Sequence, residues 1–229
     1  MTKASDRSQL PKAADAPLKK AAYDRFQQAL LKGAIRPGQL VSQKELVALL
    51  DMSIGALREL LPRLEAEGLL TVMPQRGIQI TMIDLPIIRD AFQMRMALER
   101  EAVISAVRTL PDEAIDEQER LHRDILARLE AGGDLPPDFF DEGQSVDGAF
   151  HELLVGCTRN DLLIHAYHVN STRIRLIKLD RIKLTRLTLP SAFGDHLAVI
   201  EALKARDRAA AVAALEAHIR NARDRAIEL

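Results

Sequence analysis

The stretch from Gln43 to Thr81 constrains the fold more than any other part of the chain. A helical pattern covers residues 43–50, a short polar break follows, and a second helical pattern covers residues 53–68. Leucines at i, i+3, i+4 and i+7 give the second segment one apolar face, and Gly68 is typical of a helix C-terminus. Two short helices joined by three residues are typical of a helix-turn-helix.

The residues after the second helix predict a β-hairpin. Residues 69–73 and 78–81 have strand character, and the turn between them contains Pro74 and Gly77. A hairpin in this position is the wing of a winged helix-turn-helix. Helix-turn-helix pairs also occur in small helical domains that bind no DNA, and spacing alone does not separate the two interpretations.

Three cations of this unit favour the DNA-binding interpretation. Lys44 lies at the start of the first helix, Arg58 lies early in the second, and Arg76 lies at the tip of the hairpin. Cations that converge in this way can contact the phosphates and bases of one duplex.

The run from Gly33 to Thr81 resembles the winged helix-turn-helix of GntR-type bacterial transcription regulators, including the Ile35-Arg36-Pro37-Gly38 turn before the first strand. The family usually has an arginine where this chain has Ile54, and isoleucine can pack against a thymine methyl group but cannot donate a hydrogen bond to guanine. We therefore expect a different base preference. The residues expected to contact DNA are Lys44, Ser53, Ile54, Gly55, Arg58, Gln75, Arg76 and Gly77.

Charge is distributed unevenly between the two parts of the chain. The net charge of the 229 residues is −1, but residues 1–82 carry 12 Lys and Arg against 8 Asp and Glu, which leaves 20 against 25 for the remainder. A basic first part suits DNA, because phosphate neutralisation requires local positive charge. The single Cys157 cannot form an internal disulfide, and no signal peptide or long apolar span is present, so we expect a cytoplasmic protein without membrane contact.

The patterns predict a mainly α protein with three parts. Residues 1–17 form a mobile tail, residues 18–82 the winged helix-turn-helix with its small β-hairpin, and residues 83–229 an all-α bundle. The helix expected to open the winged unit covers residues 18–33. The helices expected in the bundle cover residues 86–110, 111–131, 137–155, 160–187, 191–205 and 207–227.

Asp147 and His151 are four residues apart and therefore share one helix face, which is a metal-ligand spacing that also arises by chance. His196 and His218 are equidistant from the turn expected at residues 206–207, so an antiparallel hairpin would place them side by side. His151 and His165 lie symmetrically about the break at residues 157–160, and His151 and His168 nearly so, and periodicity does not choose among these pairs.

The second part resembles the ligand-binding domain of the FadR branch of GntR regulators, the FCD domain. The family's Asp-x-x-Phe-His motif is represented by Asp147, Phe150 and His151, and its two later histidines by His196 and His218. The resemblance implies that these aspartate and histidine residues bind one divalent metal. It also implies that His122, His165 and His168 are ordinary histidines at the helix surface or the edge of the core.

One carboxylate and three imidazoles suit zinc, nickel or manganese and leave coordination positions open. The resemblance implies that a small organic acid is sensed there. Arg95 resembles a family arginine that points into the cavity, where it could bind a carboxylate by a bidentate contact, although a solvated helix arginine fits its position equally well.

Together these expectations describe a transcription regulator and not an enzyme, and the resemblance implies a repressor more often than an activator. It would bind a two-fold DNA operator as a homodimer and be released by a small carboxylate effector. Two alternatives remain open. An open metal site could belong to a metal-dependent hydrolase, or the metal could itself be the signal, without an organic effector.

Overall fold

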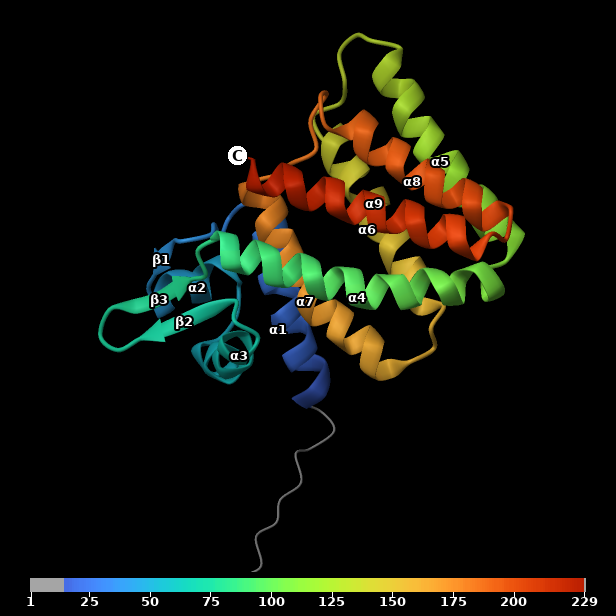
Figure 1. Ribbon diagram of the computed structural model, residues 1–229. Helices are drawn as coiled ribbons and strands as arrows, with labels where there is room; N and C mark the ends of the chain where they lie inside the picture. The colour runs from blue at the N-terminus through green and yellow to red at the C-terminus, as the bar shows by residue number, and fades with distance from the viewer. Residues whose placement is uncertain (1–14, 229) are drawn as a thin grey trace, which may run out of the picture. The chain divides into compact units, whose positions relative to one another are not determined.

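Helices dominate both parts of the chain, and the only strands in residues 15–228, which the computed structural model describes, lie in the first part (Figure 1). The chain divides into two compact units that meet between Met82 and Ile83. The elements of the first unit are α1 (Asp15–Leu31), β1 (Leu40–Val41), α2 (Gln43–Leu49), α3 (Ile54–Ala66), β2 (Leu70–Met73) and β3 (Gly77–Ile80). Those of the second are α4 (Leu85–Thr109), α5 (Asp112–Glu130), α6 (Phe139–Gly156), α7 (Asp161–Asp180), α8 (Leu189–Lys204) and α9 (Arg208–Ile227).

Side-chain caps fix where the two helices of the helix-turn-helix begin. The Ser42 hydroxyl accepts a hydrogen bond from Glu45 N, while the Glu45 carboxylate accepts one from Ser42 N, so α2 opens with a capping box. The Ser53 hydroxyl accepts a hydrogen bond from Ala56 N and caps α3. Caps of this kind contribute about 1 kcal/mol each to helix stability.

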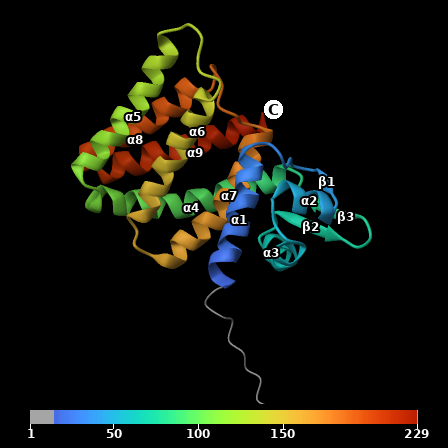
Figure 2. The ribbon, with the colours of Figure 1, turned by 180° about the vertical axis from the view of Figure 1, so that it is seen from behind.

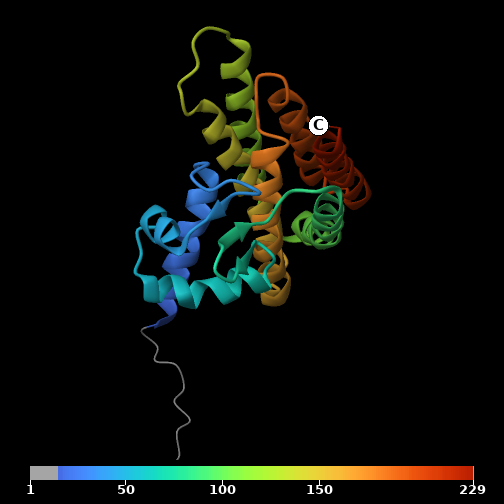
Figure 3. The same ribbon diagram turned by 90° about the vertical axis from the view of Figure 1, so that its left-hand side faces the viewer.

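α3 is held by its buried leucines and by a polar contact to α1. The four leucines that the sequence pattern assigns to one face are all buried: Leu57, Leu60, Leu61 and Leu64. At the C-terminal end, the Glu67 carboxylate accepts hydrogen bonds from the Tyr23 hydroxyl at 2.6 Å and from Arg63 Nε at 2.9 Å. The Arg63 guanidinium also lies over the Tyr23 ring. These contacts fix the orientation of α3 within its unit, beside the strands in Figure 3.

The wing is a three-stranded antiparallel sheet in the order β1-β3-β2, because the short β1 adds to the expected hairpin. β2 pairs with β3 so that Leu70 faces Ile80 and Met73 faces Gly77, and β1 pairs with β3 so that Val41 faces Ile78. Alternate residues of β3 are buried, which is the period of a strand with one covered face.

The second unit is a bundle in which α4 is the central element. α4 packs against α6, α7 and α9, and α8 packs against α5 and α9 (Figure 2). α8 and α9 form the expected antiparallel hairpin. Its turn contains Arg206 with a φ of +54°, and the Asp207 side chain caps α9 by accepting from Ala210 N. Arg206 Nη1 donates to the carbonyls of Val107 and Leu110, which ties this turn to the end of α4.

Two helix boundaries of the bundle differ from the sequence prediction. α7 ends at Asp180, seven residues before the expected end at residue 187. The segment that follows is held by threonines, because Thr185 N donates to Thr188 Oγ1 and Thr188 Oγ1 donates to the Lys183 carbonyl. Such side-chain to backbone bonds compete with helix formation. α8 begins at Leu189, so Pro190 lies in its first turn, where proline is favoured.

The first helix also begins earlier than expected, at Asp15, so that residues 15–17 of the expected tail are helical. The remainder of that tail, residues 1–14, lies outside the described residues. No helix within residues 15–228 combines the length and the apolar character that crossing a membrane would require.

Candidate functional sites

Four buried side chains of the bundle converge on one point. Asp147 and His151 come from α6, His196 from α8 and His218 from α9, and one candidate ligand atom from each lies within 4.8 Å of the others. The Nε2 atoms of His196 and His218 are 3.2 Å apart, and His196 Nε2 is 3.7 Å from Asp147 Oδ1. Atoms bound to one ion at about 2.0–2.2 Å lie roughly 3–4 Å apart. The cluster therefore has the composition and dimensions to bind one divalent metal ion.

Neighbouring carboxylates orient two of these imidazoles. His151 Nδ1 lies 2.6 Å from Glu99 Oε2, and His218 Nδ1 lies 3.6 Å from Asp195 Oδ2. At 2.6 Å His151 Nδ1 is placed to donate to Glu99, which directs the Nε2 lone pair of His151 into the cluster, whereas the 3.6 Å contact of His218 is an ionic contact longer than a hydrogen bond. Carboxylates behind histidine ligands serve this purpose in metal sites generally.

His122 orients the third imidazole and is the principal correction to the sequence analysis. Its side chain is completely buried, and Nδ1 lies 2.7 Å from the Gln118 carbonyl, an acceptor, so Nε2 carries the lone pair. Nε2 in turn lies 2.9 Å from His196 Nδ1, which must then be the donor. The expectation of an ordinary helix-surface or core-edge histidine is wrong for His122, whereas His165 and His168 are exposed as expected.

Arg95 lies beside the cluster rather than in solvent. It is 3% exposed, and its Nε donates to Glu99 Oε1 at 2.7 Å. Its Nη2 is 2.6 Å from His151 Nε2 and 3.5 Å from His218 Nε2. The third nitrogen, Nη1, is buried and has no hydrogen-bond partner among the described residues. The burial of Arg95 shows that the alternative of a solvated helix arginine is wrong.

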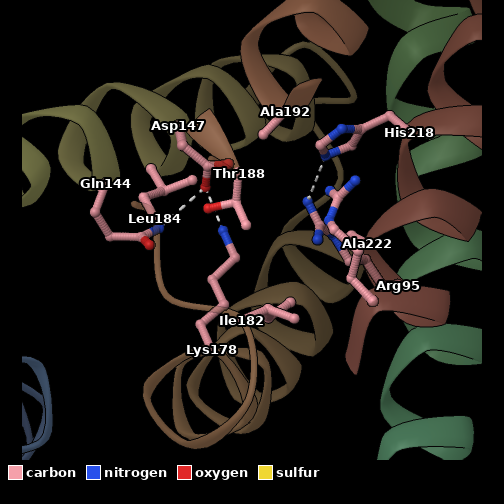
Figure 4. Close-up of a pocket in the computed structure, with 11 residues that line it drawn as sticks. Arg95, Gln144, Asp147, Lys178, Ile182, Leu184, Thr188, Ala192, His218 and Ala222 are labelled. Atoms are coloured by element: carbon pink, nitrogen blue, oxygen red, sulfur yellow. Dashed lines mark hydrogen bonds and ion pairs between the residues drawn. The ribbon is translucent and has the colours of Figure 1, made fainter. Parts of the chain in front are cut away.

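A pocket opens onto these residues (Figure 4). Its cavity volume is about 20 Å³ with the side chains as they stand, which is enough for an ion or a water molecule. Lys178 from α7 and Gln144 from α6 both donate to Asp147 Oδ2, while Arg95 and His218 lie together on the other side. The lining residues are Arg95, Gln144, Asp147, Lys178, Ile182, Leu184, Thr188, Ala192, His218, Ala222 and Arg225.

The electrostatic environment keeps the acids of this site ionised and two of its histidines neutral. Burial opposes ionisation of Asp147, but the charge of Lys178, with that of Arg95 nearby, holds its pKa well below the usual range. Burial also opposes ionisation of Glu99, yet Arg95 and His151 lower its pKa to about 2. Burial lowers the pKa of His218 to about 4 and that of His196 well below the usual range. Ionised carboxylates and neutral imidazoles are the forms that bind a metal.

In the first unit, the cations expected to contact DNA are all exposed. Lys44 lies in the first turn of α2, Arg58 in the second turn of α3, and Arg76 in the turn between β2 and β3. Ile54, the first residue of α3, is 44% exposed, and Gly55 beside it is also exposed. The side chain of Ile54 is therefore accessible to a partner.

Three other residues of the predicted set have structural roles. Ser53 caps α3. Gln75 adopts a φ of +60° after Pro74, and Arg76 N donates to the Met73 carbonyl, which is the pattern of a type II turn. Gly77 has a φ of +118°, and a Cβ there would lie 2.6 Å from the Val41 carbonyl oxygen. Gly77 is therefore required for close approach of β1 to β3.

Comparison with known families identifies both units. The profile described as bacterial regulatory proteins of the gntR family matches residues 18–80, and that of the FCD domain matches residues 90–221. The chain belongs to the GntR family and carries an FCD domain. It is a transcription regulator, and its first unit is the DNA-binding winged helix-turn-helix of that family.

Relatives and solved structures agree with this assignment. The Nta operon transcriptional regulator of Aminobacter aminovorans is 30% identical over 85% of this chain and 87% of its own length. The HTH-type transcriptional repressor GlaR of Escherichia coli strain K12 is 29% identical over 83% and 87%. The structure of E. coli McbR/YncC has a TM-score of 0.70 at 22% identity and covers 89% of this chain and 94% of its own. A GntR regulator from Rhodococcus sp. RHA1 has a TM-score of 0.72 at 19% identity, covering 93% and 98%, and both structures show the same fold.

Sequence reasoning missed four residues that surround the candidate metal site of the FCD domain: Glu99, His122, Lys178 and Asp195. Glu99 carried one available signal, because it follows Arg95 by four residues and could pair with it on one helix face. The other three approach the cluster from different helices, and no local pattern in the sequence indicates those contacts.

Proposed function

We propose that this regulator represses transcription by binding a two-fold operator as a homodimer, and that a small organic acid releases it. The acid binds in the FCD pocket beside a divalent metal, most simply zinc, held by Asp147, His151, His196 and His218. The protein acts in the cytoplasm, where its DNA is. Support for repression comes from GlaR, which is named a repressor, and support for a dimer comes from the two-fold operators that helix-turn-helix proteins read.

The observation that best supports an organic-acid effector is the unpartnered Nη1 atom of Arg95. This nitrogen of the buried guanidinium has no acceptor among the described residues, and a carboxylate is the partner that best fits planar donors. It lies in the same pocket as Asp147 and His218. A zinc ion bound by four protein ligands can accept a further oxygen ligand, so one carboxylate could contact both the metal and Arg95.

Metal binding should strengthen acid binding, because the metal and Arg95 compete for the single lone pair of His151 Nε2. In the described structure that lone pair faces Arg95 Nη2 at 2.6 Å. It cannot accept from Arg95 and bind a metal ion at the same time. Metal binding would therefore leave Nη2, in addition to Nη1, free to donate to the effector.

The same contacts argue against a metal-dependent hydrolase. Such an enzyme requires a general base whose pKa lies near the working pH. Glu99, the buried carboxylate beside the cluster, is paired with Arg95 and His151 and has a pKa of about 2. Glu99 is therefore already paired and is too weak a base for this role.

Operator release is the direct test. A DNA sequence selected from random duplexes would be titrated with the full chain by fluorescence anisotropy, with zinc or with a chelator, and with a panel of organic acids. We expect an acid to weaken DNA binding only in the presence of metal and only when Arg95 is intact. Release by metal alone would support the metal-sensor alternative, and turnover of carboxylic esters or amides would support an enzyme.

Metal content tests the ligand set separately. Elemental analysis should show loss of the metal in His196→Ala and His218→Ala and a full equivalent in His165→Ala and His168→Ala, because the last two residues are exposed and lie away from the cluster. Retention of the metal by the first pair and loss by the second would show that the ligand assignment is wrong.

A further inference from the structure

The first turn of α3 presents an apolar surface at the place where a helix-turn-helix protein reads bases. In such proteins the second helix lies in the major groove, and its N-terminal residues contact the base edges. Here those residues are Ile54, Gly55 and Ala56, none of which has a side chain that donates or accepts a hydrogen bond. The adjacent Ser53 hydroxyl is engaged as the helix cap. The first side chain of α3 that can donate to a base is that of Arg58, one turn further along.

Ile54 is directed away from the core of its unit. The four leucines of α3 are buried, whereas Ile54 is 44% exposed. Gly55 adds no side chain beside it, and a Cβ built there would have Ser53 Oγ as its nearest neighbour, at 3.8 Å. The first turn of α3 is therefore open to a partner that approaches from outside the unit.

The position of Ile54 is fixed, because α3 is anchored at both ends. Its first turn is capped by Ser53, and beyond its last turn the Glu67 carboxylate accepts hydrogen bonds from Tyr23 and Arg63. A side chain on a supported helix is positioned more accurately than one on a loop. Ile54 can therefore make the same contact with one base pair in every complex.

The chemistry of the major groove selects the base that suits such a side chain. The base pairs present hydrogen-bond donors and acceptors there, and thymine alone among the four standard bases adds a methyl group, at C5. Isoleucine against a polar edge would remove water from donors and acceptors without replacing its hydrogen bonds. Isoleucine against the methyl group removes apolar surface from water instead.

We propose that Ile54 reads a thymine in each operator half-site through the C5 methyl group alone. Because no hydrogen bond takes part, 5-methylcytosine should be accepted at the same position for the same reason, and unmethylated cytosine should not. Cytosine methylation at this position would then raise operator affinity. This inference rests on the operator binding of the proposed function, and not on the metal or the effector.

Substitutions that change only the methyl group test the contact. An operator selected by the full chain from random duplexes would carry deoxyuridine, which pairs as thymine does, at one thymine at a time. Fluorescence anisotropy at one salt concentration would then give the affinities. We expect one thymine in each half-site at which uracil weakens binding about fourfold, as burial of one methyl group allows. At that position 5-methylcytosine should exceed cytosine by a similar factor. Insensitivity of every thymine to this change would overturn the proposal.

Variants show which residue contacts the methyl group. Ile54→Ala shortens the side chain, so the uracil penalty should disappear at this thymine and stay unchanged at the others. Ile227→Ala is the matched control, because Ile227 is a similarly exposed isoleucine at the end of α9 and should keep the penalty. Thermal melting checks the fold of both variants. A penalty that persists in Ile54→Ala, or equal weakening of all duplexes by this variant, would overturn the role of Ile54.

The outcomes distinguish this inference from the proposed function. If the full chain enriches no duplex from the random pool, the operator binding of the proposed function and the reading of thymine are both wrong. If an operator is bound and is released by an organic acid, while uracil and thymine are equivalent at every position, only the role of Ile54 is wrong.

Discussion

His122 Nε2 lies 2.9 Å from His196 Nδ1, so a histidine that is not in the metal cluster determines which nitrogen of a cluster histidine faces inward. His122 is itself fixed, because its Nδ1 is satisfied by the Gln118 carbonyl. The chain of contacts leads from the backbone of α5 to the centre of the bundle. Carboxylates occupy the corresponding positions behind His151 and His218.

Replacement of His122 should therefore lower metal affinity without removing a ligand. His122→Phe fills similar space but offers no acceptor to His196, and we expect metal affinity to fall about 10- to 100-fold. His122→Gln retains an acceptor and should restore most of that loss, which a purely structural role in packing would not predict. Competition titration with a chromophoric chelator measures both, and His165→Phe is the exposed control. Equal affinities of the Phe and Gln variants would contradict the role assigned to His122.

Arg58→Ala should weaken specific DNA binding and leave the fold intact. The side chain is exposed in the second turn of α3, where removal of a base contact costs about 1–3 kcal/mol and relaxes preference at one position. Footprinting and anisotropy measure the effect, and thermal melting checks the fold. Arg120→Ala, an exposed arginine of α5, is the control and should bind as the wild type does. Unchanged operator affinity and base preference in Arg58→Ala would show that Arg58 does not contact DNA.

Arg76→Gln should weaken binding to all DNA sequences to a similar extent. An arginine at the tip of the wing is placed to contact the backbone, and loss of one phosphate contact lowers the slope of log affinity against log salt by about one unit. Arg100→Gln, an exposed arginine of α4, should keep the wild-type slope. A wild-type slope in Arg76→Gln would show that the wing makes no phosphate contact through this residue.

Two glycines of the first unit should respond in opposite ways to alanine. Gly77→Ala forces a Cβ against the Val41 carbonyl at an unfavourable φ and should destabilise the unit by about 1–3 kcal/mol. Gly55→Ala has room, since its nearest atom is Ser53 Oγ at 3.8 Å, and should stabilise α3 by up to about 1 kcal/mol. Denaturant unfolding measures both. If Gly77→Ala were as stable as Gly55→Ala, the close approach of β1 and β3 would not constrain the wing.

The sequence predicts contacts correctly where the regular geometry of a helix converts spacing along the chain into distance in space. His196 and His218 lie side by side, as their equal distance from the expected turn predicts, because α8 and α9 are uninterrupted and have the same rise per residue. The four leucines of α3 are buried because their period matches the helix. The rival histidines, His165 and His168, are exposed on α7 and take no part in the cluster.

The sequence was insufficient where the outcome depends on packing between distant helices. His122 lies seven residues after Ile115 and three before Ile125, so it shares the buried face of α5 and its burial could have been predicted from period. Its contact with His196 could not, because that contact depends on the packing of α5 against α8.

The end of α7 was predicted too late, because the segment after it is held by hydrogen bonds of Thr185 and Thr188, and these bonds leave no mark on the hydrophobic period of the sequence. Lys178 has no sequence signal, because its partner Asp147 is on another helix.

Asp147 and His218 are separated by most of the FCD domain along the chain but lie together at its centre. An ion that joined them would link α6 to the C-terminal helix, α9, so that α9 could not detach from the bundle until the ion had left. Sub-global opening of the domain would then be governed by metal release. Amide hydrogen exchange in α9 would report occupancy of the metal site even when DNA and effector are absent.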